Sequence, residues 1–376
     1  MEIEVSQEKL AKALSNVSRV APARATLPIL NNILIKVQDK KVSLVATNLD
    51  MAVIDYLPVS ASKNGTITVP AQLITEFVSN LPKSSQVKIA SKENKINVTS
   101  NHYSSVINGT PADDFPELPE INEKAAVIFK IGVEEFKNGV NQVIVAVSHD
   151  LNRPALTGVH FYTKDKALFL GATDGYRVAK KKLVNNVKSE VKVTIPAVTL
   201  QEVLRSLGDD MEEVELSFNE DLVRFRLGEI EIISKLIDTE YPDLDKLIPA
   251  DSDINFIVNR DELLRVTKLA SLFARHSTND IISCETDLKS NTVSIRSITN
   301  EYGENDSTLE TKVSKDGKIF IPSRYLIDAI NIINGVDISV GFSEGADQIT
   351  GIKHPLIIKE QKSDDYIHII MPLDAS

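Results

Sequence analysis

The sequence predicts an α+β protein made of three tandem copies of one domain, each with two helices on one face of antiparallel sheets. Three observations lead to this prediction. Landmark residues recur at a constant spacing along the 376 residues, short apolar runs alternate as strands do, and helical patterns occupy matched places in each copy. The repeat is too long for a solenoid unit, so each copy is expected to be a whole domain.

The landmarks recur every 126 residues. Thr47, Thr173 and Thr299 are spaced in this way. The same step separates the prolines Pro28 and Pro154, Pro70, Pro196 and Pro322, and Pro116 and Pro242. The stretches "PEINEKAAV" (119–127) and "PADSDIN" (249–255) are rich in turn formers and charge, which is typical of linkers. We therefore expect domains at 1–123, 124–250 and 251–376.

Each copy is expected to contain two helices and about eight strands. The six helices are predicted over 6–20, 71–83, 132–148, 197–208, 259–275 and 323–334. In each copy the second helix is expected to begin just after the step "VPA", "IPA" or "IPS", where a proline suits a helix start. The stretch "VELSFNEDLVRFRL" (214–227) predicts a hairpin, because apolar residues alternate on both sides of "NED".

The charge is distributed unevenly between helices and the remainder of the chain. The formal net charge is −11, yet the six predicted helices together carry +3. A basic helical layer would follow the phosphate backbone of a nucleic acid without reading its sequence. The alternative is that the helices carry ordinary solvating charges of both signs.

Three features of the sequence indicate the cellular compartment. It has no apolar run of about 18 residues, and its first ten residues, "MEIEVSQEKL", are acidic and polar. The single cysteine, Cys284, fits a reducing compartment. We therefore expect a cytoplasmic protein. Cys284 lies in "DIISCETD", which favours a buried strand over a reactive nucleophile.

No motif of an enzyme is evident. The six histidines show no helical metal-ligand spacing, and no phosphate-binding glycine loop or nucleophile elbow occurs, so no metal or other cofactor is expected. Asp174, in "GATDGYRVA", could act as a general base. Its counterparts in the repeat are Asn48 and Asn300, which favours a turn in which the side chain bonds its own backbone.

The chain resembles the family of bacterial beta sliding clamps, the beta subunits of DNA polymerase III. The resemblance covers the chain in order and rests on "RATLPIL" (24–30), "ATDGYRVA" (172–179), "SKLIDTEYPDL" (234–244) and "IIMPL" (369–373). It implies a non-catalytic processivity factor: two arc-shaped chains close head to tail as a homodimeric ring around duplex DNA, with helices inside. It also implies that an ATP-driven clamp loader opens the ring.

The resemblance further implies a hydrophobic peptide-binding pocket between the second and third domains. Its partners would be the polymerase alpha subunit, the clamp loader, and other polymerases and repair proteins, each through a short linear motif. The matching positions are Leu156, Thr173, Gly175, Tyr176, Arg177, Val178, Pro242, Lys246, Leu247, Tyr325, Ile369, Ile370, Met371, Pro372 and Leu373. Tyr176 stands where some members have His, and Lys246 where some have Arg.

Two further sets of residues are expected. Arg24 matches a DNA-facing arginine of the family, and Arg153 is its counterpart in the second copy. Helix position adds Lys9, Lys12, Lys137, Arg205, Arg265, Lys268 and Arg324 to the DNA-facing set. For the dimer interface, the resemblance points to Ile107 against Leu272 and Phe273.

Two other classes of function remain open from the residues alone. One is a three-domain hydrolase that uses Asp174 and His149, and the other is a protein scaffold without a DNA role. Substitution of Asp174 would impair a hydrolase, whereas substitution of Leu373 would impair a clamp. Retention on circular but not linear DNA would exclude the scaffold.

Overall fold

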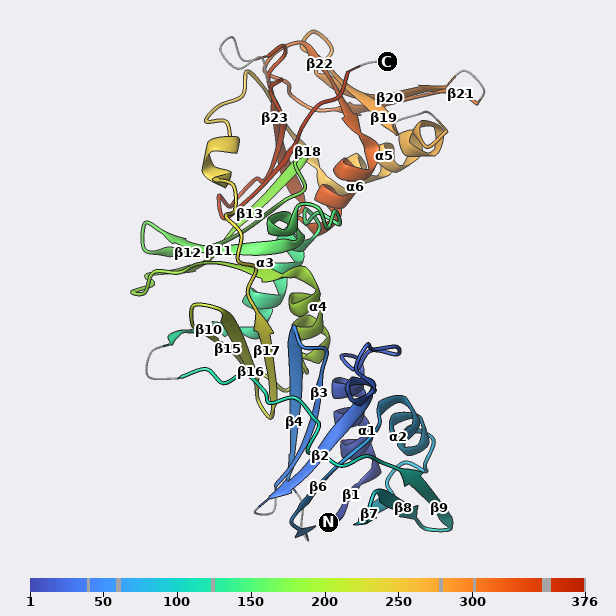
Figure 1. The fold of residues 1–376 in the computed structure, drawn as a ribbon. Helices are drawn as coiled ribbons and strands as arrows, with labels where there is room; N and C mark the ends of the chain where they lie inside the picture. The colour runs from blue at the N-terminus through green and yellow to red at the C-terminus, as the bar shows by residue number, and fades with distance from the viewer. Residues whose placement is uncertain are drawn as a thin grey trace. The chain divides into compact units, whose positions relative to one another are not determined.

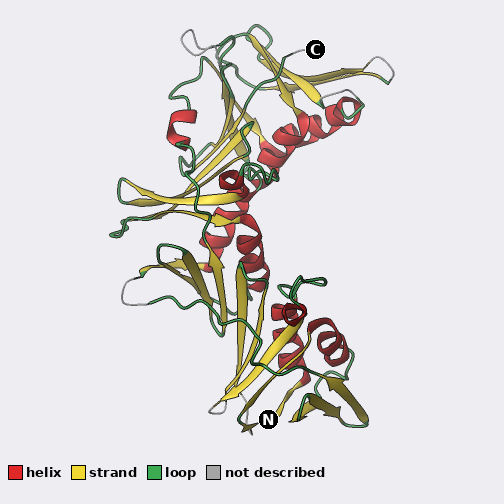
Figure 2. Cartoon of the chain, in the orientation of Figure 1, coloured by secondary structure: helices red, strands yellow, loops and turns green. Residues whose placement is uncertain are grey.

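The structure is a computed structural model that describes residues 1–38, 41–58, 62–122, 126–276, 280–299, 302–346 and 353–374. The predicted boundary at 123/124 and the predicted turn residue Asn300 lie outside these residues. Within them, every strand pair is antiparallel, and the three copies contain nine, eight and eight strands. The α+β prediction is therefore confirmed (Figures 1 and 2).

All six predicted helices form, each within one residue of its predicted start. They are α1 (Gln7–Ser18), α2 (Ala71–Ser79), α3 (Val133–Ile144), α4 (Ala197–Ser206), α5 (Arg260–Ala274) and α6 (Ser323–Ile332). All six end earlier than predicted. In α2 the amide of Asn80 donates to the carbonyl of Glu76, and Pro82 follows, so the helix stops before the predicted residue 83.

The repeat is visible in the elements themselves. Strands β6 (Gly65–Pro70), β14 (Lys192–Pro196) and β22 (Gly317–Pro322) each end on a landmark proline, and a helix starts at the next residue. The 3-10 helices η1 (Pro28–Asn31) and η2 (Pro154–Thr157) each begin on one. Proline fixes its own φ near the helical value and needs no amide partner there, so the same residue type starts the same element in successive copies.

The chain forms two compact units, and the first comprises residues 1–133 and 198–236. Its larger sheet has the order β10-β15-β16-β17-β4-β3-β2-β6, and its smaller sheet the order β5-β1-β7-β8-β9. Helix α1 packs on β3 and β4 and against α2. The strands not yet given are β1 (Glu2–Ser6), β2 (Asn32–Gln38), β3 (Lys41–Thr47), β4 (Met51–Pro58), β5 (Ser62–Lys63), β7 (Gln86–Lys92), β8 (Lys95–Ser100), β9 (Tyr103–Asn108), β10 (Val127–Gly132), β15 (Glu213–Phe218), β16 (Leu222–Leu227) and β17 (Ile230–Lys235).

The second unit comprises residues 134–197 and 237–376. Its larger sheet has the order β14-β11-β12-β13-β25-β24-β23-β18, and its smaller sheet the order β21-β20-β19-β22, against which α5 packs. The remaining strands are β11 (Gly158–Lys164), β12 (Ala167–Thr173), β13 (Arg177–Asn185), β18 (Ile254–Asn259), β19 (Ile281–Asp287), β20 (Thr292–Thr299), β21 (Gly303–Glu310), β23 (Asp337–Phe342), β24 (Leu356–Glu360) and β25 (Tyr366–Ile370).

Each eight-stranded sheet is built from two successive copies. In the first unit β17 pairs with β4, so that Ile233 lies opposite Ala52. In the second unit β25 pairs with β13, so that Ile369 lies opposite Val178. Ala52 and Val178 are themselves 126 residues apart, so the two junctions are equivalent. Main-chain hydrogen bonds therefore join neighbouring copies within each unit.

The predicted hairpin is β15 and β16, and its apolar residues are buried on one face. At its turn, Asn219 Oδ1 accepts hydrogen bonds from the amides of Asp221 and Leu222. Within the described ranges, no helix is long and apolar enough to cross a membrane.

Candidate functional site

The stretch "GATDGYRVA" forms the end of β12, a tight turn and the start of β13. The Thr173 hydroxyl donates to the carbonyl of Arg177 over 2.7 Å, which closes the turn. Asp174 Oδ1 accepts the amides of Tyr176 and Arg177 at 2.9 and 3.0 Å. Gly175 has a φ of +95°, which favours glycine. Asn48 makes the same two bonds, to the amides of Asp50 and Met51, in the first copy.

The turn interpretation of Asp174 is therefore confirmed. Its second oxygen, Oδ2, is 3.0 Å from Nε of Arg177, so both carboxylate oxygens are engaged with the turn. His149 is exposed in the loop after α3, and no hydrogen bond or ion pair joins it to Asp174 among the described residues. The geometry gives no support to a hydrolase built on these two residues.

Arg177 connects the turn to the third copy. Its side chain is 9 % exposed, and Nη1 is 2.8 Å from Asp328 Oδ2 on α6. The guanidinium carbon also lies 4.4 Å from the ring centroid of Tyr325, on the same helix. A guanidinium stacked on a ring and paired with two carboxylates is held in one orientation. The predicted residues Arg177 and Tyr325 are thus in contact.

A cluster of apolar side chains lies beside this turn. Its buried members are Ala155, Val178, Tyr241, Leu244 and Ile369, and Leu156, Tyr162, Ile248 and Ile367 pack against them partly buried. We call these nine residues the apolar patch. The Tyr241 hydroxyl accepts the amide of Thr173 over 3.0 Å, and burial raises its pKa above the ordinary value, so it remains a neutral phenol.

Sequence reasoning included Leu156, Val178 and Ile369 but missed Tyr241 and Leu244. The repeat contained the signal for both. Phe115 and Leu118 stand 126 residues earlier, in "FPEL" against "YPDL", and they pack on the equivalent junction of the first unit. An aromatic and a leucine at matched places in two copies indicate core residues.

The C-terminal residues dock onto the second unit. Ile369 and Ile370 pair with β13 in the last strand. Beyond it, the amide of Met371 donates to the carbonyl of Tyr176 at 2.8 Å, and the amide of Leu373 donates to the carbonyl of Phe320 at 2.9 Å. Met371, Pro372 and Leu373 remain half-buried. The expectation that this apolar end docks is confirmed.

Exposed side chains surround the apolar patch. Tyr176 is 56 % exposed, and Leu247 is 46 % exposed on the 3-10 helix η3 (Leu244–Leu247). Pro242 and Lys246 are also exposed, and Lys246 lies 3.4 Å from Asp243. Apolar side chains left exposed beside a buried apolar floor are typical of a docking surface and supply no catalytic group.

Neither Cys284 nor the potential metal-binding side chains form a reactive centre in the described part of the chain. Cys284 is 3 % exposed in β19, where burial and then the charge of Glu285 raise its pKa to about 12. The buried-strand interpretation is confirmed. Within the described segments, no group of three or more His, Cys, Asp or Glu side chains could hold a metal ion.

The side chains predicted to face DNA are all exposed. They lie on five helices and in two loops: Lys9 and Lys12, Lys137, Arg205, Arg265 and Lys268, Arg324, and the loop residues Arg24 and Arg153. Among the described residues, two of them have acidic partners. Arg153 lies 3.0 Å from Asp150, and Arg205 lies 3.8 Å from Glu202. Their charge is therefore partly compensated within the chain.

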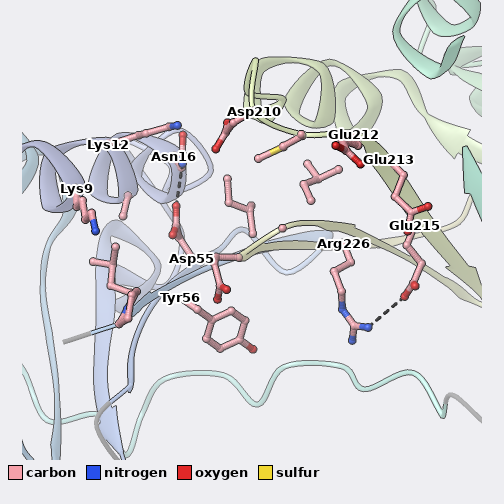
Figure 3. A pocket seen from close by; sticks show the side chains of 18 of the residues that line it. Lys9, Lys12, Asn16, Asp55, Tyr56, Asp210, Glu212, Glu213, Glu215 and Arg226 are labelled. Carbon is pink, nitrogen blue, oxygen red and sulfur yellow. Dashed lines mark hydrogen bonds and ion pairs between the residues drawn. The ribbon is translucent and has the colours of Figure 1, made fainter. Parts of the chain in front are cut away.

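Lys9 and Lys12 line a cavity of about 660 Å³ in the first unit (Figure 3). The opposite wall is acidic and includes Asp210, Glu212 and Glu213. On its floor, Asp55 is 5 % exposed and accepts the amide of Asn16 at 2.8 Å, and burial raises its pKa. Acidic side chains therefore lie across the cavity from the two lysines of α1, which weakens the attraction that Lys12 alone would exert on a phosphate.

One predicted interface residue does not fit the structure. Ile107 lies on β9, at the edge of the five-stranded sheet, but its side chain is 2 % exposed and faces the core. The exposed apolar side chains of this strand are Tyr103 and Val106, which are 53 % and 65 % exposed, and Val106 lies on the opposite face from Ile107. Leu272, at 54 %, is exposed on α5, and Phe273 is half-buried. Strand β9 is therefore an edge strand with Val106 exposed on it.

Comparisons with known proteins cover the chain from end to end. Models of the DNA polymerase III beta subunit match in order: its N-terminal domain at residues 1–119, its central domain at 130–243 and its C-terminal domain at 245–374. The beta sliding clamp of Bacillus subtilis (strain 168) is 28 % identical over 99 % of both chains. That of Staphylococcus aureus (strain Mu50) is 27 % identical, also over 99 % of both.

Solved structures give the same result. The crystal structure of the DNA polymerase sliding clamp from Bacillus subtilis superposes with a TM-score of 0.93 at 27 % identity, over 100 % of both chains. The DNA polymerase III beta chain from Streptococcus pneumoniae superposes with a TM-score of 0.91 at 25 % identity, again over 100 % of both.

Proposed function

Because the chain belongs to the DNA polymerase III beta subunit family, we propose that it is a processivity clamp that encircles duplex DNA as a homodimeric ring. The observation that carries this proposal is the match of three domain models in order along the chain, together with the full-length superposition on a sliding clamp. The protein acts in the cytoplasm as a non-catalytic accessory subunit, with no cofactor of its own.

The mechanism is topological. A closed ring stays on DNA without a tight contact, so weak and screened contacts from exposed lysines and arginines to phosphates allow it to slide. The six predicted helices carry +3 within a net charge of −11, so the acidic charge lies outside the helices and repels nucleic acid there. A polymerase tethered to the ring remains at a high effective concentration near the primer end, and this concentration produces processivity.

Ring closure joins the first copy of one chain to the third copy of its partner. On one side, the edge strand β9 offers unpaired backbone groups and the exposed side chain of Val106. On the other side, α5 offers Leu272 and Phe273. Apolar contact supported by strand-edge pairing is suited to an interface that a loader must reopen.

Partners dock on the apolar patch through short linear motifs. The polymerase alpha subunit, the clamp loader, and other polymerases and repair proteins compete for it. Support comes from the predicted residues that lie on or beside the apolar patch, with Tyr176, Leu247 and Leu373 accessible to an incoming side chain. A peptide would anchor by burying an apolar side chain there.

The test is primer extension on a long primed circular template by the polymerase alpha subunit and clamp loader. Leu373→Ala should shorten the products, whereas Asp174→Asn should leave their length nearly unchanged, because an amide oxygen preserves the turn. Leu288→Ala, at an exposed leucine in the turn after β19, is the matched control. Full-length products with Leu373→Ala, or a loss confined to Asp174→Asn, would contradict the proposal.

A further inference from the structure

Asp245, on η3 beside the apolar patch, is paired with two lysines from the sheet. Lys164 Nζ, at the end of β11, lies 2.6 Å from Oδ2, and Lys180 Nζ, in β13, forms an ion pair with Oδ1. The Tyr162 hydroxyl donates weakly to Oδ1 over 3.5 Å. The carboxylate is only 23 % exposed, and bonds from the two lysines outweigh burial and keep the pKa of Asp245 below its usual value. The carboxylate is therefore a charged tie between η3 and two strands.

Leu244 and Asp243, the two residues before Asp245, also hold η3 in place. A Cβ at Gly171 would lie 2.1 Å from Cδ1 of Leu244, so Leu244 occupies space that only glycine leaves open. Asp243 caps η3 by accepting the amide of Asp245 at 3.1 Å. Leu244 thus anchors η3 in the apolar patch, while Asp245 ties its outer side to the sheet.

The first copy lacks this tie. The step of 126 residues places Pro119, Gln38 and Ile54 where the second copy has Asp245, Lys164 and Lys180, and none of the three is charged. All three of these first-copy residues line a cavity of about 790 Å³ between the strands and the segment 116–121. The charged cluster is therefore no general requirement of the repeat. It occurs at the junction that carries the candidate docking surface.

We propose that Asp245, with Lys164 and Lys180, is a positioning element that holds η3 so that Pro242, Lys246 and Leu247 form a preformed wall of the docking surface. We call these three charged residues the η3 lock. The inference rests on the proposed function. Because this wall is already ordered before binding, no free energy is lost in ordering it when a peptide binds. Such ordering costs lower the affinity of flexible binding sites.

The experiment measures two quantities on the full-length protein. The first is amide hydrogen exchange over residues 242–248, and the second is the dissociation constant for the polymerase alpha subunit, by surface plasmon resonance. The variants are Asp245→Asn, Lys164→Met/Lys180→Met, and Lys164→Arg/Lys180→Arg, which keeps both charges. Glu215→Gln is the matched control, because Glu215 is 16 % exposed and paired with Lys130 and Arg226 in the other unit.

For Asp245→Asn and the double Met variant, exchange over 242–248 should rise about tenfold and the dissociation constant about three- to tenfold. The double Arg variant and Glu215→Gln should resemble the unmodified protein in both. If hydrogen exchange over 242–248 were unchanged in Asp245→Asn, the η3 lock would not hold η3. If exchange were faster but the dissociation constant unchanged, the η3 lock would have no role in docking. Unaltered affinity with Leu373→Ala would instead mean that the docking surface itself is wrong.

Discussion

Arg177 and Asp328 form an ion pair of 2.8 Å that joins β13 to α6. Arg177 is also paired with Asp174 at 3.0 Å and stacks on Tyr325. One buried guanidinium therefore holds together the turn of "GATDGYRVA" and the helix that begins at Ser323. The candidate docking surface depends on this contact, because it fixes the turn and Tyr325 relative to each other.

Arg177→Met should lower the free energy of unfolding by about 2–4 kcal/mol, because two partly buried carboxylates lose their shared cation. Urea unfolding followed by circular dichroism measures this change. Arg205→Met is the control, since Arg205 is exposed and its contact with Glu202 is 3.8 Å, and it should lower the free energy by no more than about 1 kcal/mol. Equal losses for the two variants would show that the guanidinium contributes no more than a surface pair.

Gly171→Ala should destabilise the protein by about 1–3 kcal/mol, because the new methyl group would overlap Leu244. Leu244→Ala in the same chain should recover part of the loss, which a double-mutant cycle would measure. Gly132→Ala is the control, since no atom lies within 4 Å of a Cβ placed there. If Gly171→Ala were as stable as Gly132→Ala, Leu244 would not fill that space.

Stability should fall as the pH is lowered from about 6.5 to about 4, partly through His160. Burial and then the charge of Lys192 lower its pKa from 6.5 to about 4, and the ring is stacked 4.7 Å from that of Tyr241. Between these pH values, His160 therefore binds a proton in the unfolded chain but remains neutral in the folded protein. The stabilisation is fully present above pH 6.5, and up to about 3 kcal/mol is lost towards pH 4.

His160→Gln should flatten the pH dependence of the unfolding free energy over this range without abolishing it. His368 contributes in the same direction, because burial lowers its pKa to about 3. Urea titrations at a series of pH values compare the two proteins. An unchanged slope in His160→Gln would contradict the assignment.

Arg265→Ala and Lys268→Ala should each weaken binding to short duplex DNA and reduce the dependence of log affinity on log salt by up to about 0.9. Both side chains are exposed on α5, and neither forms an ion pair among the described residues. Fluorescence anisotropy at several salt concentrations measures the slope. Arg205→Ala should have a smaller effect, because Glu202 compensates its charge. If Arg205→Ala weakened DNA binding more than Arg265→Ala and Lys268→Ala, the residues of α5 would not face DNA.

The sequence predicts well what short-range chemistry decides. The landmark prolines mark element starts, and the pair Asn48 and Asp174 identifies the same turn in two copies. It predicts poorly what depends on contacts distant in the chain. The partner of Arg177 lies on another helix, and the burial of Tyr241 and Leu244 requires β25 to lie beside β13.

The misassigned side chain of Ile107 has a different cause. Ile107 and Val106 are adjacent, apolar and in one strand, so a shift of one residue exchanges the core face for the outer face. Only the register of β9 against β8, in which Ile107 lies opposite Ile96, decides between them. The predicted boundaries at 123/124 and 250/251 stay predictions.

The central claim is that the protein holds DNA by encircling it. The most direct measurement is to load the protein onto a nicked circular plasmid with a clamp loader, separate the complex by gel filtration, and cut the plasmid once with a restriction enzyme. The account predicts that the protein remains on the circle and leaves within minutes of the cut, because the ring slides off the ends. Equal retention on circular and linear DNA would contradict it.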